Sequence, residues 1–450
     1  MEVVAIRTPS LGDTSYLVHH GGVGVAIDVQ RDIGRVTDAL ERTGVTLVAV
    51  LETHVHNDYI SGAPELARLT GADLVLPAGA GVAYPNRPAF HMEDIDAGGR
   101  MTLRPLHTPG HTLEHTSYLV LLDEDPVIVF TGGSLLVGSA GRTDLLGDRY
   151  ARSLARLQHG SLQRLAQLPD AVAVRPTHGG GSFCTASNVG GVQSTIGEER
   201  AGNPLLSISD PEAFADRQLS GHMPYPTYYA HMGHINRDGP PAFEDDEPPE
   251  LSPEAVEELM ASVGVVDGRP QTNFAAGHIA GSIGVELGDR FAPWVGWLVP
   301  FGTPLVLVLD PGQDGAAVYS DLARIGYGVA GVLRGVDGWA DAGLPLESHE
   351  TAPVDRLAEA LEDGAQVVDV RDPAEWESEH LPGSIHRYVP DLINDLADLD
   401  RSRPVWVVCA TGFRASIAAG LLLREGLEPI VVNGGGVSET LALLRQSSQG

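Results

Sequence analysis

The pattern of apolar and polar positions in the first part of the chain predicts a layered domain of strands and helices. Amphipathic runs at 34–44 and 63–71 predict helices. Short apolar runs bounded by turn residues predict strands at 3–8, 14–20, 24–29, 48–54, 72–77, 102–109, 116–122 and 126–133. Helices interspersed with strands in this way favour an α/β or α+β layer fold.

The second half of the chain contains a diverged internal repeat. Residues 265–289 read VVDGRPQTNFAAGHIAGSIGVELGD, and residues 367–391 read VVDVRDPAEWESEHLPGSIHRYVPD. In both copies an aspartate precedes a histidine by 11 residues, and a small-residue turn follows the histidine. An apolar strand comes next, which ends at Asp310 in the first copy and contains Cys409 in the second. The repeat predicts two tandem α/β domains, each with a parallel sheet.

Length and composition set the expected domain boundaries. A chain of 450 residues is too long for a single hydrophobic core. The segment 236–250, NRDGPPAFEDDEPPE, is acidic and proline-rich, which predicts a linker. We therefore expect a first domain over 1–235, then this linker, and two further domains over 251–350 and 351–450.

Charge and cysteine content narrow the classes of function. The chain has 60 acidic against 29 basic residues, and this balance argues against binding to nucleic acid or to an anionic membrane. No apolar run approaches the ~20 residues that span a bilayer, and the N-terminus lacks the pattern of a signal peptide. Two cysteines, Cys184 and Cys409, do not make a disulfide framework. A cytoplasmic protein that binds no membrane is expected.

The stretch VWVVCATGFRAS contains the clearest candidate for a catalytic nucleophile. An apolar strand leads into Cys409, and a short loop leads from the cysteine into a helical run. Such a loop directs backbone amides and a helix N-terminus at the thiol and favours the thiolate, which is the nucleophilic form. Gly412 permits a tight turn, and Arg414 would place a fixed positive charge against an anionic substrate. The alternative is a buried strand-end cysteine with no chemistry.

The stretches DVRDPAEWESEHLPGSI and CATGFRAS resemble those of a rhodanese domain. The resemblance implies that Cys409 carries a persulfide between a sulfur donor and a sulfur acceptor. Residues 409–414 form a loop of the length found in sulfurtransferases, one residue shorter than the loop of related phosphatases. Within this loop, Thr411 and Phe413 are expected to contact the substrate.

The first copy of the repeat resembles a rhodanese domain without its nucleophile. Asp310 stands at the position of Cys409, and no arginine follows it at the matching spacing. This domain cannot carry a persulfide, so we expect a spacer, a dimerisation surface or a channel wall. In the second copy, Asp369 and Arg371 are expected to orient the loop rather than to act in catalysis.

A candidate metal motif, THVHNDYISG, follows an early predicted strand. It presents His54, His56 and Asp58. Neutral imidazoles and a carboxylate are suitable ligands for zinc or ferrous iron. Two further histidines follow later strands, His111 in LHTPGHTLEHTSY and His178 in VRPTHGGGS.

The spacing of these histidines resembles the metallo-β-lactamase superfamily, and the similarity covers roughly residues 1–235. The segments FTGGSLLVGSAGRTD and NPLL resemble the branch that contains glyoxalase II and persulfide dioxygenases. The resemblance implies an αββα sandwich, one bound metal ion, and substrate contacts from Arg142 and Asp144. Cys184, which follows the last histidine, is either a structural cysteine or a second reactive thiol near the metal.

Two positions depart from the superfamily pattern. Tyr59 stands where a histidine is usual, and Gly133 stands where an aspartate is usual. The loss of both ligands argues against a two-metal hydrolase centre and leaves open whether a metal is bound at all. The expected site is a three-histidine set with a carboxylate and a fourth histidine as additional ligands: His54, His56 and His111, then Asp58 and His178.

The combination of domains resembles bacterial fusions of a persulfide dioxygenase with a sulfurtransferase. There, a single iron oxidises a low-molecular-weight thiol persulfide to sulfite with dioxygen. We therefore expect a rhodanese-type sulfurtransferase with added persulfide dioxygenase activity, Fe(II) ahead of Zn(II), and a homo-oligomer. The expected partners are a small-molecule persulfide, thiosulfate or a glutathione-like thiol. The alternatives are a glyoxalase II-like thioester hydrolase and a non-catalytic N-terminal scaffold that delivers sulfane sulfur to a partner.

Overall fold

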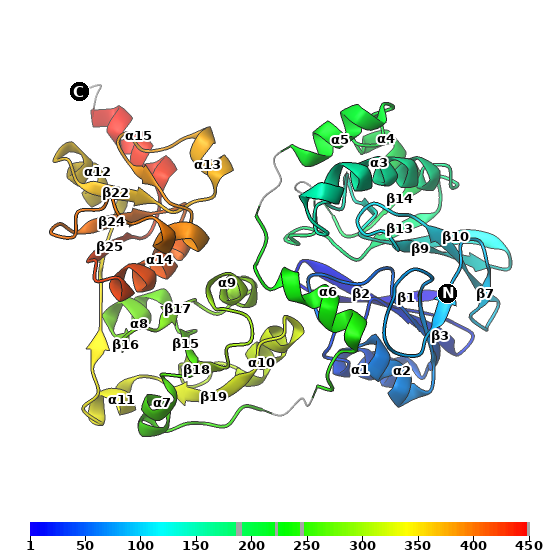
Figure 1. Ribbon diagram of the computed structural model, residues 1–450, viewed down its shortest axis with the longest axis horizontal. Coiled ribbons are helices and arrows are strands. Elements are labelled where there is room, and N and C mark those ends of the chain that lie inside the picture. The colour runs from blue at the N-terminus through cyan, green and yellow to red at the C-terminus, as the bar shows by residue number, and fades with distance from the viewer. Residues whose placement is uncertain (186–190, 221–223, 244–246, 448–450) are drawn as a thin grey trace. The chain divides into compact units, whose positions relative to one another are not determined.

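The computed structural model describes residues 1–185, 191–220, 224–243 and 247–447, which form two compact units (Figure 1). The first unit comprises residues 1–245 together with Ser320–Gly326, and the second comprises the remainder. Within the described ranges, no helix is long and apolar enough to cross a membrane.

Two six-stranded sheets form the first unit. In spatial order, the first sheet contains β1 (Glu2–Thr8), β2 (Asp13–His20), β3 (Val23–Ile27), β4 (Thr46–Leu51), β5 (Asp73–Pro77) and β6 (Arg87–Ala89). The second contains β14 (Ser194–Thr195), β13 (Ala173–Pro176), β10 (Asp125–Gly132), β9 (Thr116–Leu122), β8 (Met101–His107) and β7 (Ile95–Asp96). Each predicted strand overlaps one of β1 to β5 or β8 to β10, so those predictions are confirmed.

Helices cover the outer face of each sheet. Along β2, Tyr16 and Val18 join the core between the two sheets, whereas Leu17 joins the cluster beneath the helices. Tyr118 and Phe130 of the second sheet enter the same central core. The covering helices are α1 (Gly34–Thr43) and α2 (Ala63–Thr70) on the first sheet, and α3 (Asp148–Leu165), α4 (Ile196–Gly202) and α5 (Pro211–Leu219) on the second. The expected αββα sandwich is confirmed.

The first residues of the predicted linker 236–250 belong to a helix. The helix α6 (Tyr229–Asp238) continues past residue 236, where the linker was predicted to start. Asn236 is buried in this helix, so tertiary contacts outweigh the proline-rich composition that follows. At the other end, the amide of Leu251 donates to the carbonyl of Val332 at 2.8 Å, which ties the chain to the second unit. Residues 244–246 lie outside the described residues.

A short hairpin of β11 (Leu135–Leu136) and β12 (Ser139–Ala140) completes the first unit.

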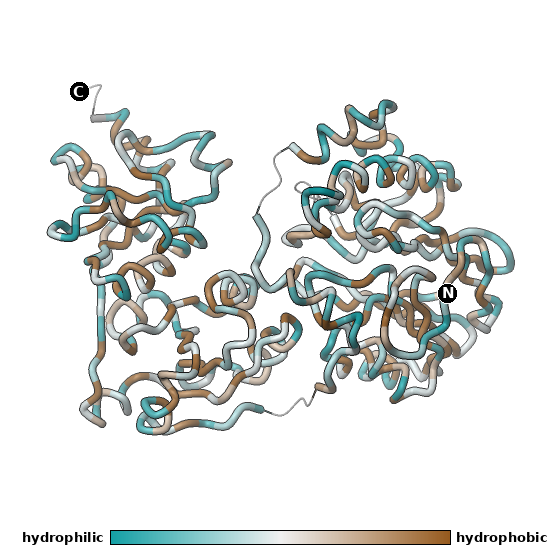
Figure 2. The backbone as a smooth tube through the Cα atoms, in the orientation of Figure 1, coloured by the Kyte–Doolittle hydropathy of each residue, from teal (hydrophilic) through white to brown (hydrophobic). Residues whose placement is uncertain are grey.

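Two parallel sheets form the second unit, and Figure 2 shows apolar residues along their strands. The first sheet contains β17 (Ile283–Gly284), β15 (Gly264–Asp267), β18 (Leu305–Leu309) and β19 (Val329–Arg334), accompanied by α7 (Pro253–Leu259), α8 (Gln271–Ala276), α9 (Phe291–Leu298), α10 (Gly315–Arg324), α11 (Asp337–Asp341) and the short pair β16 (His278–Ile279) and β20 (Leu346–Glu347). The second contains β21 (Glu350–Ala352), β25 (Pro429–Val432), β24 (Val405–Val408), β22 (Gln366–Asp369) and β23 (Ile385–His386), accompanied by α12 (Val354–Glu362), α13 (Pro373–Ser378), η1 (Val389–Asn394), α14 (Phe413–Arg424) and α15 (Val437–Ser447). Neighbouring strands in both sheets are parallel, as the repeat predicts.

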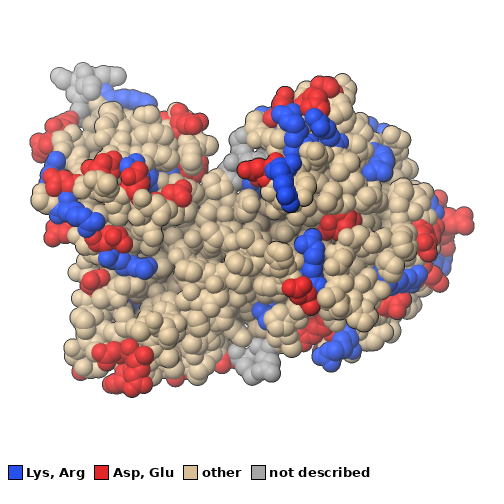
Figure 3. Space-filling view, viewed as in Figure 1, with Lys and Arg blue, Asp and Glu red and all other residues tan. Residues whose placement is uncertain are grey.

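Charged side chains lie mainly at the surface. On the face drawn in Figure 3, acidic and arginine side chains lie close to one another. Ion pairs at the surface include Arg104–Asp94, at 2.7 Å, and Arg87–Asp73, at 3.3 Å. Exposed pairs contribute little to stability. The charge therefore sets surface properties, and the folds depend on the apolar cores.

Candidate active sites

The loop that carries the THVHNDYISG motif follows β4 and is held by side chains distant in the sequence. His54 and His56 are almost completely buried. The amide of Thr53 donates to Oδ1 of Asp28 at 2.7 Å. The side-chain amide of Asn236 donates to the carbonyls of His56, at 2.9 Å, and Tyr59, at 2.8 Å. The loop is therefore fixed in place by Asp28, which directly follows β3, and by Asn236 of α6.

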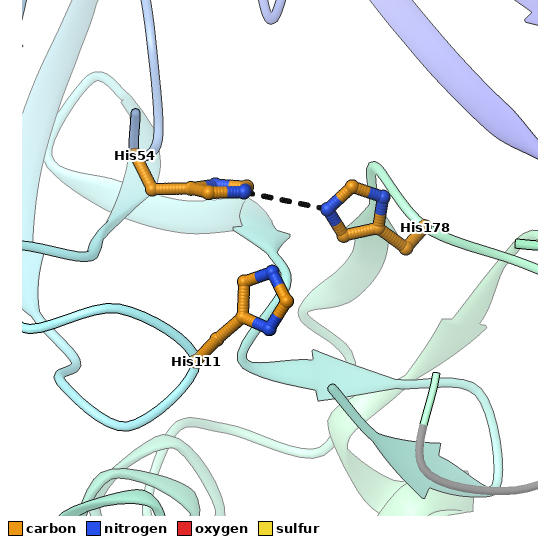
Figure 4. A group of neighbouring side chains, drawn as sticks. All are labelled: His54, His111 and His178. Carbon is orange, nitrogen blue, oxygen red and sulfur yellow. Dashed lines mark hydrogen bonds between the residues drawn. The ribbon is translucent and has the colours of Figure 1, made fainter. Parts of the chain in front are cut away.

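Three histidine rings converge at the ends of three strands (Figure 4). His54 follows β4, His111 follows β8 and His178 follows β13. One ring nitrogen of each lies within 4.8 Å of the others, and the Nε2 atoms of His54 and His178 are 3.4 Å apart. Nε2 of His111 is buried and has no hydrogen-bond partner among the described residues. These nitrogens share one small, enclosed volume.

Hydrogen bonds on the far side of each ring determine which nitrogen faces the centre. Nδ1 of His111 donates to the carbonyl of Arg142 at 2.8 Å. The hydroxyl of Thr53 donates to Asp28 at 2.8 Å, so its oxygen accepts from Nδ1 of His54 at 2.9 Å. Since Nδ1 carries the proton in both rings, each Nε2 presents a lone pair to the centre.

His178 follows the same rule with a carboxyl partner. Its Nδ1 lies 2.8 Å from Oδ1 of Asp13 and 3.3 Å from Oδ2 of Asp58. Its Nε2 therefore faces Nε2 of His54 with a lone pair as well. Two lone pairs at this separation repel one another unless a cation lies between them.

The protonation states of the three rings also suit a metal ion. Burial, and then the neighbouring imidazoles, lowers the pKa of His54 and of His111 well below 6.5, and burial lowers the pKa of His178. Only the neutral imidazole ligates a metal. Three converging nitrogens with further positions open fit zinc or ferrous iron. The residues present therefore fit one metal ion.

His56, which the sequence places among the ligands, lies beside this centre and belongs to two neighbouring groups that could hold a metal ion, one with Asp58 and His178 and one with Asp28 and Glu52. Its Nε2 lies 2.7 Å from Oε2 of Glu52, 3.3 Å from Oδ1 of Asp28 and 2.9 Å from the hydroxyl of Tyr59. Burial lowers the pKa of His56, but the two carboxylates outweigh burial and raise it well above 6.5.

The three-histidine set expected from the sequence is brought together only in part. His54 and His111 lie in one group with His178, and His56 lies in the neighbouring groups. Buried Glu52 and Asp28 attract the His56 ring, and ligation by His56 stays a prediction. Asp58 lies in a neighbouring cluster with His56 and His178, where burial and then Asp13 raise the pKa of Asp58 to about 7.

Gly133 lies directly against the centre. A Cβ atom built on it would lie 2.2 Å from Cδ2 of His111, so no side chain fits while His111 keeps this position. The amide of Gly133 donates to Nε2 of His115 at 3.0 Å. Burial lowers the pKa of His115 to about 3, which keeps it neutral as an acceptor. The sequence did not predict a role for His115, although this residue lies four positions after His111 in the same motif.

Arg142 and Asp144, which the resemblance assigns to substrate binding, form an ion pair. The guanidinium donates to both carboxylate oxygens at 2.7 and 2.6 Å and lies 4.6 Å from the ring centre of Tyr225. Arg142 is buried. The pair holds the backbone whose carbonyl orients His111, and its role in substrate contact stays a prediction.

Cys184 is buried near the same loop. Its Sγ donates to the hydroxyl of Tyr229 at 3.9 Å. Burial, and then nearby carboxyl groups, raises the pKa of Cys184 well above its usual value, so the thiol stays protonated. This environment favours the structural interpretation of Cys184.

Cys409 follows β24, at the N-terminus of α14. The amide of Gly412 donates to Sγ at 3.1 Å. Gly412 has φ of +102°, a left-handed conformation that favours glycine. Thr411 is exposed, and Phe413 is half-buried with its ring 6.5 Å from that of Trp294. The sulfur is thus held at the base of a loop that reaches solvent.

Arg414 contacts two acidic residues at the start of α13, Glu375 within the helix and Asp372 at its N-cap. Its guanidinium forms a two-pronged ion pair with Glu375, in which Nη2 donates to Oε1 at 2.8 Å, and Asp372 lies 3.6 Å away. Burial would raise the pKa of Glu375, but Arg414 lowers it to about 2. The positive charge expected from the sequence is therefore partly neutralised by residues of the DVRDPAEW stretch, which sequence reasoning did not assign to the site.

Comparison with known proteins identifies the families of the domains that carry the two sites. The rhodanese-like domain family matches residues 252–342 and 353–442, and the metallo-beta-lactamase superfamily matches residues 12–178. A hydroxyacylglutathione hydrolase of Methylobacterium sp. (strain 4-46) is 30% identical over 215 residues, which is 42% of this chain and 80% of that protein.

Two solved structures are also similar. A metallo-beta-lactamase from Staphylococcus aureus subsp. aureus COL has 26% identity and a TM-score of 0.66, covering 74% of this chain and 99% of that one. ETHE1 from Myxococcus xanthus has 28% identity and a TM-score of 0.46, covering 53% of this chain and 98% of that one. The chain belongs to the metallo-β-lactamase superfamily through its N-terminal domain, which is followed by two tandem rhodanese-like domains.

Proposed function

We propose that the protein is an enzyme of sulfur metabolism that transfers sulfane sulfur through Cys409 and oxidises a thiol persulfide at the N-terminal centre. The observation that carries the proposal is the position of Cys409. Its sulfur accepts a hydrogen bond from the Gly412 amide at 3.1 Å, at the start of α14. The domain that contains it matches the rhodanese-like family. This placement gives the sulfur a backbone N–H donor and the N-terminus of a helix.

The transfer step needs no external oxidant. The Cys409 thiolate attacks the outer sulfur of the donor, a bond forms between the two sulfurs, and the donor's own sulfur–sulfur bond breaks. The donor leaves as sulfite or as a thiolate, and a persulfide remains on Cys409. An acceptor nucleophile then takes the outer sulfur and restores the thiolate. The Gly412 amide stabilises negative charge on the sulfur throughout.

The N-terminal centre would hold one ion through Nε2 of His54, His111 and His178. Bound ferrous iron would supply the redox chemistry by which one dioxygen and one water convert a persulfide into a thiol and sulfurous acid. The three rings would supply three nitrogen ligands, and the remaining positions would be available to the substrate. Their buried surroundings exclude competing water. Gly133 offers no carboxylate that could bridge to a second ion, which supports a single-metal site.

A thioester hydrolase is the second candidate, and the hydroxyacylglutathione hydrolase relatives favour it. Their 30% identity spans most of the length of such a protein. Against it stand Tyr59 and Gly133, because a two-metal hydrolytic centre requires ligands at both positions. Hydrolysis of S-lactoylglutathione by the zinc-loaded protein would support this candidate over persulfide oxidation.

Thiosulfate-dependent formation of thiocyanate tests the transferase half. Cys409→Ser is expected to abolish it, whereas Asp310→Ala, at the matching position of the other repeat, is expected to leave it intact. Persisting activity in the Cys409 variant would refute the proposal.

Metal analysis and oxygen uptake test the other half. Iron near one equivalent, with dioxygen consumed when glutathione persulfide is added and lost in His111→Ala, is the expected result. Protein that binds neither iron nor zinc would remove both metal-dependent candidates and leave the N-terminal domain as a scaffold.

A further inference from the structure

We infer that Asp13 is a positioning residue that makes His178 the third ligand of the metal centre. The inference rests on the proposed single-metal centre and concerns a residue that no sequence motif marks. In the superfamily pattern a carboxylate stands at the position of Gly133. Here that position offers no side chain, so the third ligand must come from elsewhere.

The backbone brings Asp13 opposite His178. The two residues form an isolated antiparallel bridge between the start of β2 and the loop after β13. The amide of Thr14 donates to the carbonyl of Thr177 at 2.8 Å, and the amide of Gly179 donates to the carbonyl of Gly12 at 2.8 Å. This register fixes which side chain of β2 faces the histidine. A slip by one residue would turn Asp13 to the other face.

Gly12 is part of the same arrangement. It has φ of +70°, and a Cβ atom there would lie 2.2 Å from the backbone nitrogen of Ser182. A side chain at this position would push the strand away from the loop after His178. Gly12 thus allows the start of β2 to lie close to the loop after β13, and Asp13 contacts His178 across this short distance.

The side chains complete the contact. Oδ1 of Asp13 lies 2.8 Å from Nδ1 of His178, and both side chains are fully buried. The carboxyl oxygen holds the Nδ1 proton and the plane of the ring. Nε2 of His178 is thereby directed at Nε2 of His54, 3.4 Å away.

A carboxyl partner distinguishes His178 from the other two ligands. Nδ1 of His111 faces a backbone carbonyl, and Nδ1 of His54 faces a hydroxyl. A carboxylate behind a ligating imidazole orients the ring and strengthens its donor nitrogen. The Asp13–His178 pair therefore places a carboxyl group one ring away from the centre, whereas a carboxylate at the position of Gly133 would lie beside the centre directly.

Two substitutions separate this role from simple space filling. Asp13→Ala removes the nearer acceptor of the Nδ1 proton, at 2.8 Å, and leaves only Oδ2 of Asp58, at 3.3 Å. Asp13→Asn keeps the nearer acceptor, because the side chain of Asp58 lies beside Asp13 and would take the amide nitrogen, leaving the amide oxygen for His178. If Asp13 had only a structural role, Asp13→Ala and Asp13→Asn would not differ in their affinity for the metal ion.

The experiment measures the dissociation constant of Zn²⁺ for the full-length, metal-free protein by competition with a chromophoric chelator. Asp13→Ala is expected to weaken binding by about 10- to 100-fold, the usual effect of removing a partner behind a ligand. Asp13→Asn is expected to stay close to the unsubstituted protein. In a His178→Ala background, Asp13→Ala is expected to cause no further weakening, because its ligand is already gone. Co²⁺ absorption reports the loss of one nitrogen ligand in the same variants.

The outcomes distinguish the inference from the function on which it rests. Equal Zn²⁺ affinity in Asp13→Ala, or an equal loss with and without His178, would overturn the inference and leave the metal centre standing. Failure of the unsubstituted protein to bind Zn²⁺, Co²⁺ or Fe²⁺ would overturn both. Should Asp13→Ala not fold, Asp13→Ser, which is too short to reach Nδ1, is expected to show the same weakening.

Discussion

The two rhodanese-like domains share one buried framework around two different loops. In the first domain Arg269 pairs with Asp267 at 2.7 Å, and in the second Arg371 pairs with Asp369 at 2.8 Å. Each arginine also donates to the carbonyl eight residues further along. Because the pair is present in the domain that lacks a thiol, it stabilises the fold and does not itself constitute the active site.

A stacked histidine follows in both domains. The ring of His278 lies 3.8 Å from that of Phe274, and the ring of His380 lies 4.1 Å from that of Trp376. In each case Nδ1 of the histidine donates to the backbone carbonyl of its aromatic partner. The histidines that mark the repeat in the sequence therefore serve the fold in both copies.

The two domains differ in the loop that carries Cys409 or Asp310 and in the residue of the neighbouring helix that contacts this loop. In the second, Cys409 is followed by Arg414, and Glu375 binds the guanidinium. In the first, Asp310 replaces the cysteine, and Asn273, which matches Glu375 in the repeat, donates its amide to Asp310 at 2.8 Å. The residue on the neighbouring helix thus suits the charge of the loop that it contacts: a carboxylate faces Arg414, and an amide faces Asp310. Where the thiol is absent, this residue differs as well, whereas the buried Asp–Arg pair is the same in both domains.

The largest expected effect concerns the nucleophile. Cys409→Ser should lower kcat/KM for sulfur transfer by at least roughly a thousand-fold, because the covalent carrier is lost. Asp310→Ala should leave kcat/KM unchanged. Steady-state kinetics with thiosulfate and cyanide would show the difference, and a comparable loss in the Asp310 variant would mean that the first domain takes part in the chemistry.

The framework should respond equally in both domains. Asp267→Ala and Asp369→Ala each leave a buried guanidinium without its carboxylate, which is expected to cost about 3–5 kcal/mol of unfolding free energy. Urea unfolding monitored by tryptophan fluorescence measures this cost. An effect confined to Asp369 would contradict a shared structural role.

Glu375 should modulate the second loop with a defined pH dependence. Its pKa of about 2, against the usual 4.5, means that the ion pair with Arg414 stabilises the fold above the usual pKa and loses that effect as pH falls towards 2. Glu375→Gln should therefore be less stable than the unsubstituted protein near neutral pH, with the gap closing in acid. The same variant should lower KM for thiosulfate by roughly 3-fold, since the guanidinium is no longer neutralised. A constant gap across this pH range would refute the assignment.

The smallest effect is expected in the first loop. Asn273→Glu would place a second carboxylate against Asp310, on an exposed side chain, and should reduce stability by about 0.2–1 kcal/mol. Asn273→Gln is the matched control because it keeps the amide. Thermal unfolding of both variants, compared at low and high salt, would reveal whether repulsion is the cause: only the glutamate variant should recover in salt.

Local patterns allowed the folds and the Cys409 loop to be predicted. Apolar periodicity gave the strands of the sandwich, and the repeat gave the two parallel sheets. The sulfur, the turn glycine and the arginine lie within six consecutive residues, so spacing alone describes their geometry. The contribution of Glu375 was missed because it comes from a separate helix.

The metal centre was predicted less completely because its geometry is non-local. The sequence placed His56 among the ligands, but buried Glu52 and Asp28 attract its ring. His178 gains its orientation from Asp13, which is 165 residues away. No spacing rule connects such positions, since the sandwich alone brings the ends of β2, β4 and β13 together.

The central claim is that sulfane sulfur passes through Cys409. Intact-mass analysis after incubation with thiosulfate, followed by peptide mapping, tests it most directly. The account predicts a gain of one sulfur atom, located on the peptide that contains Cys409 and removed by cyanide. A protein that turns over while Cys409 stays unmodified, or that carries the added sulfur on Cys184 instead, would contradict it.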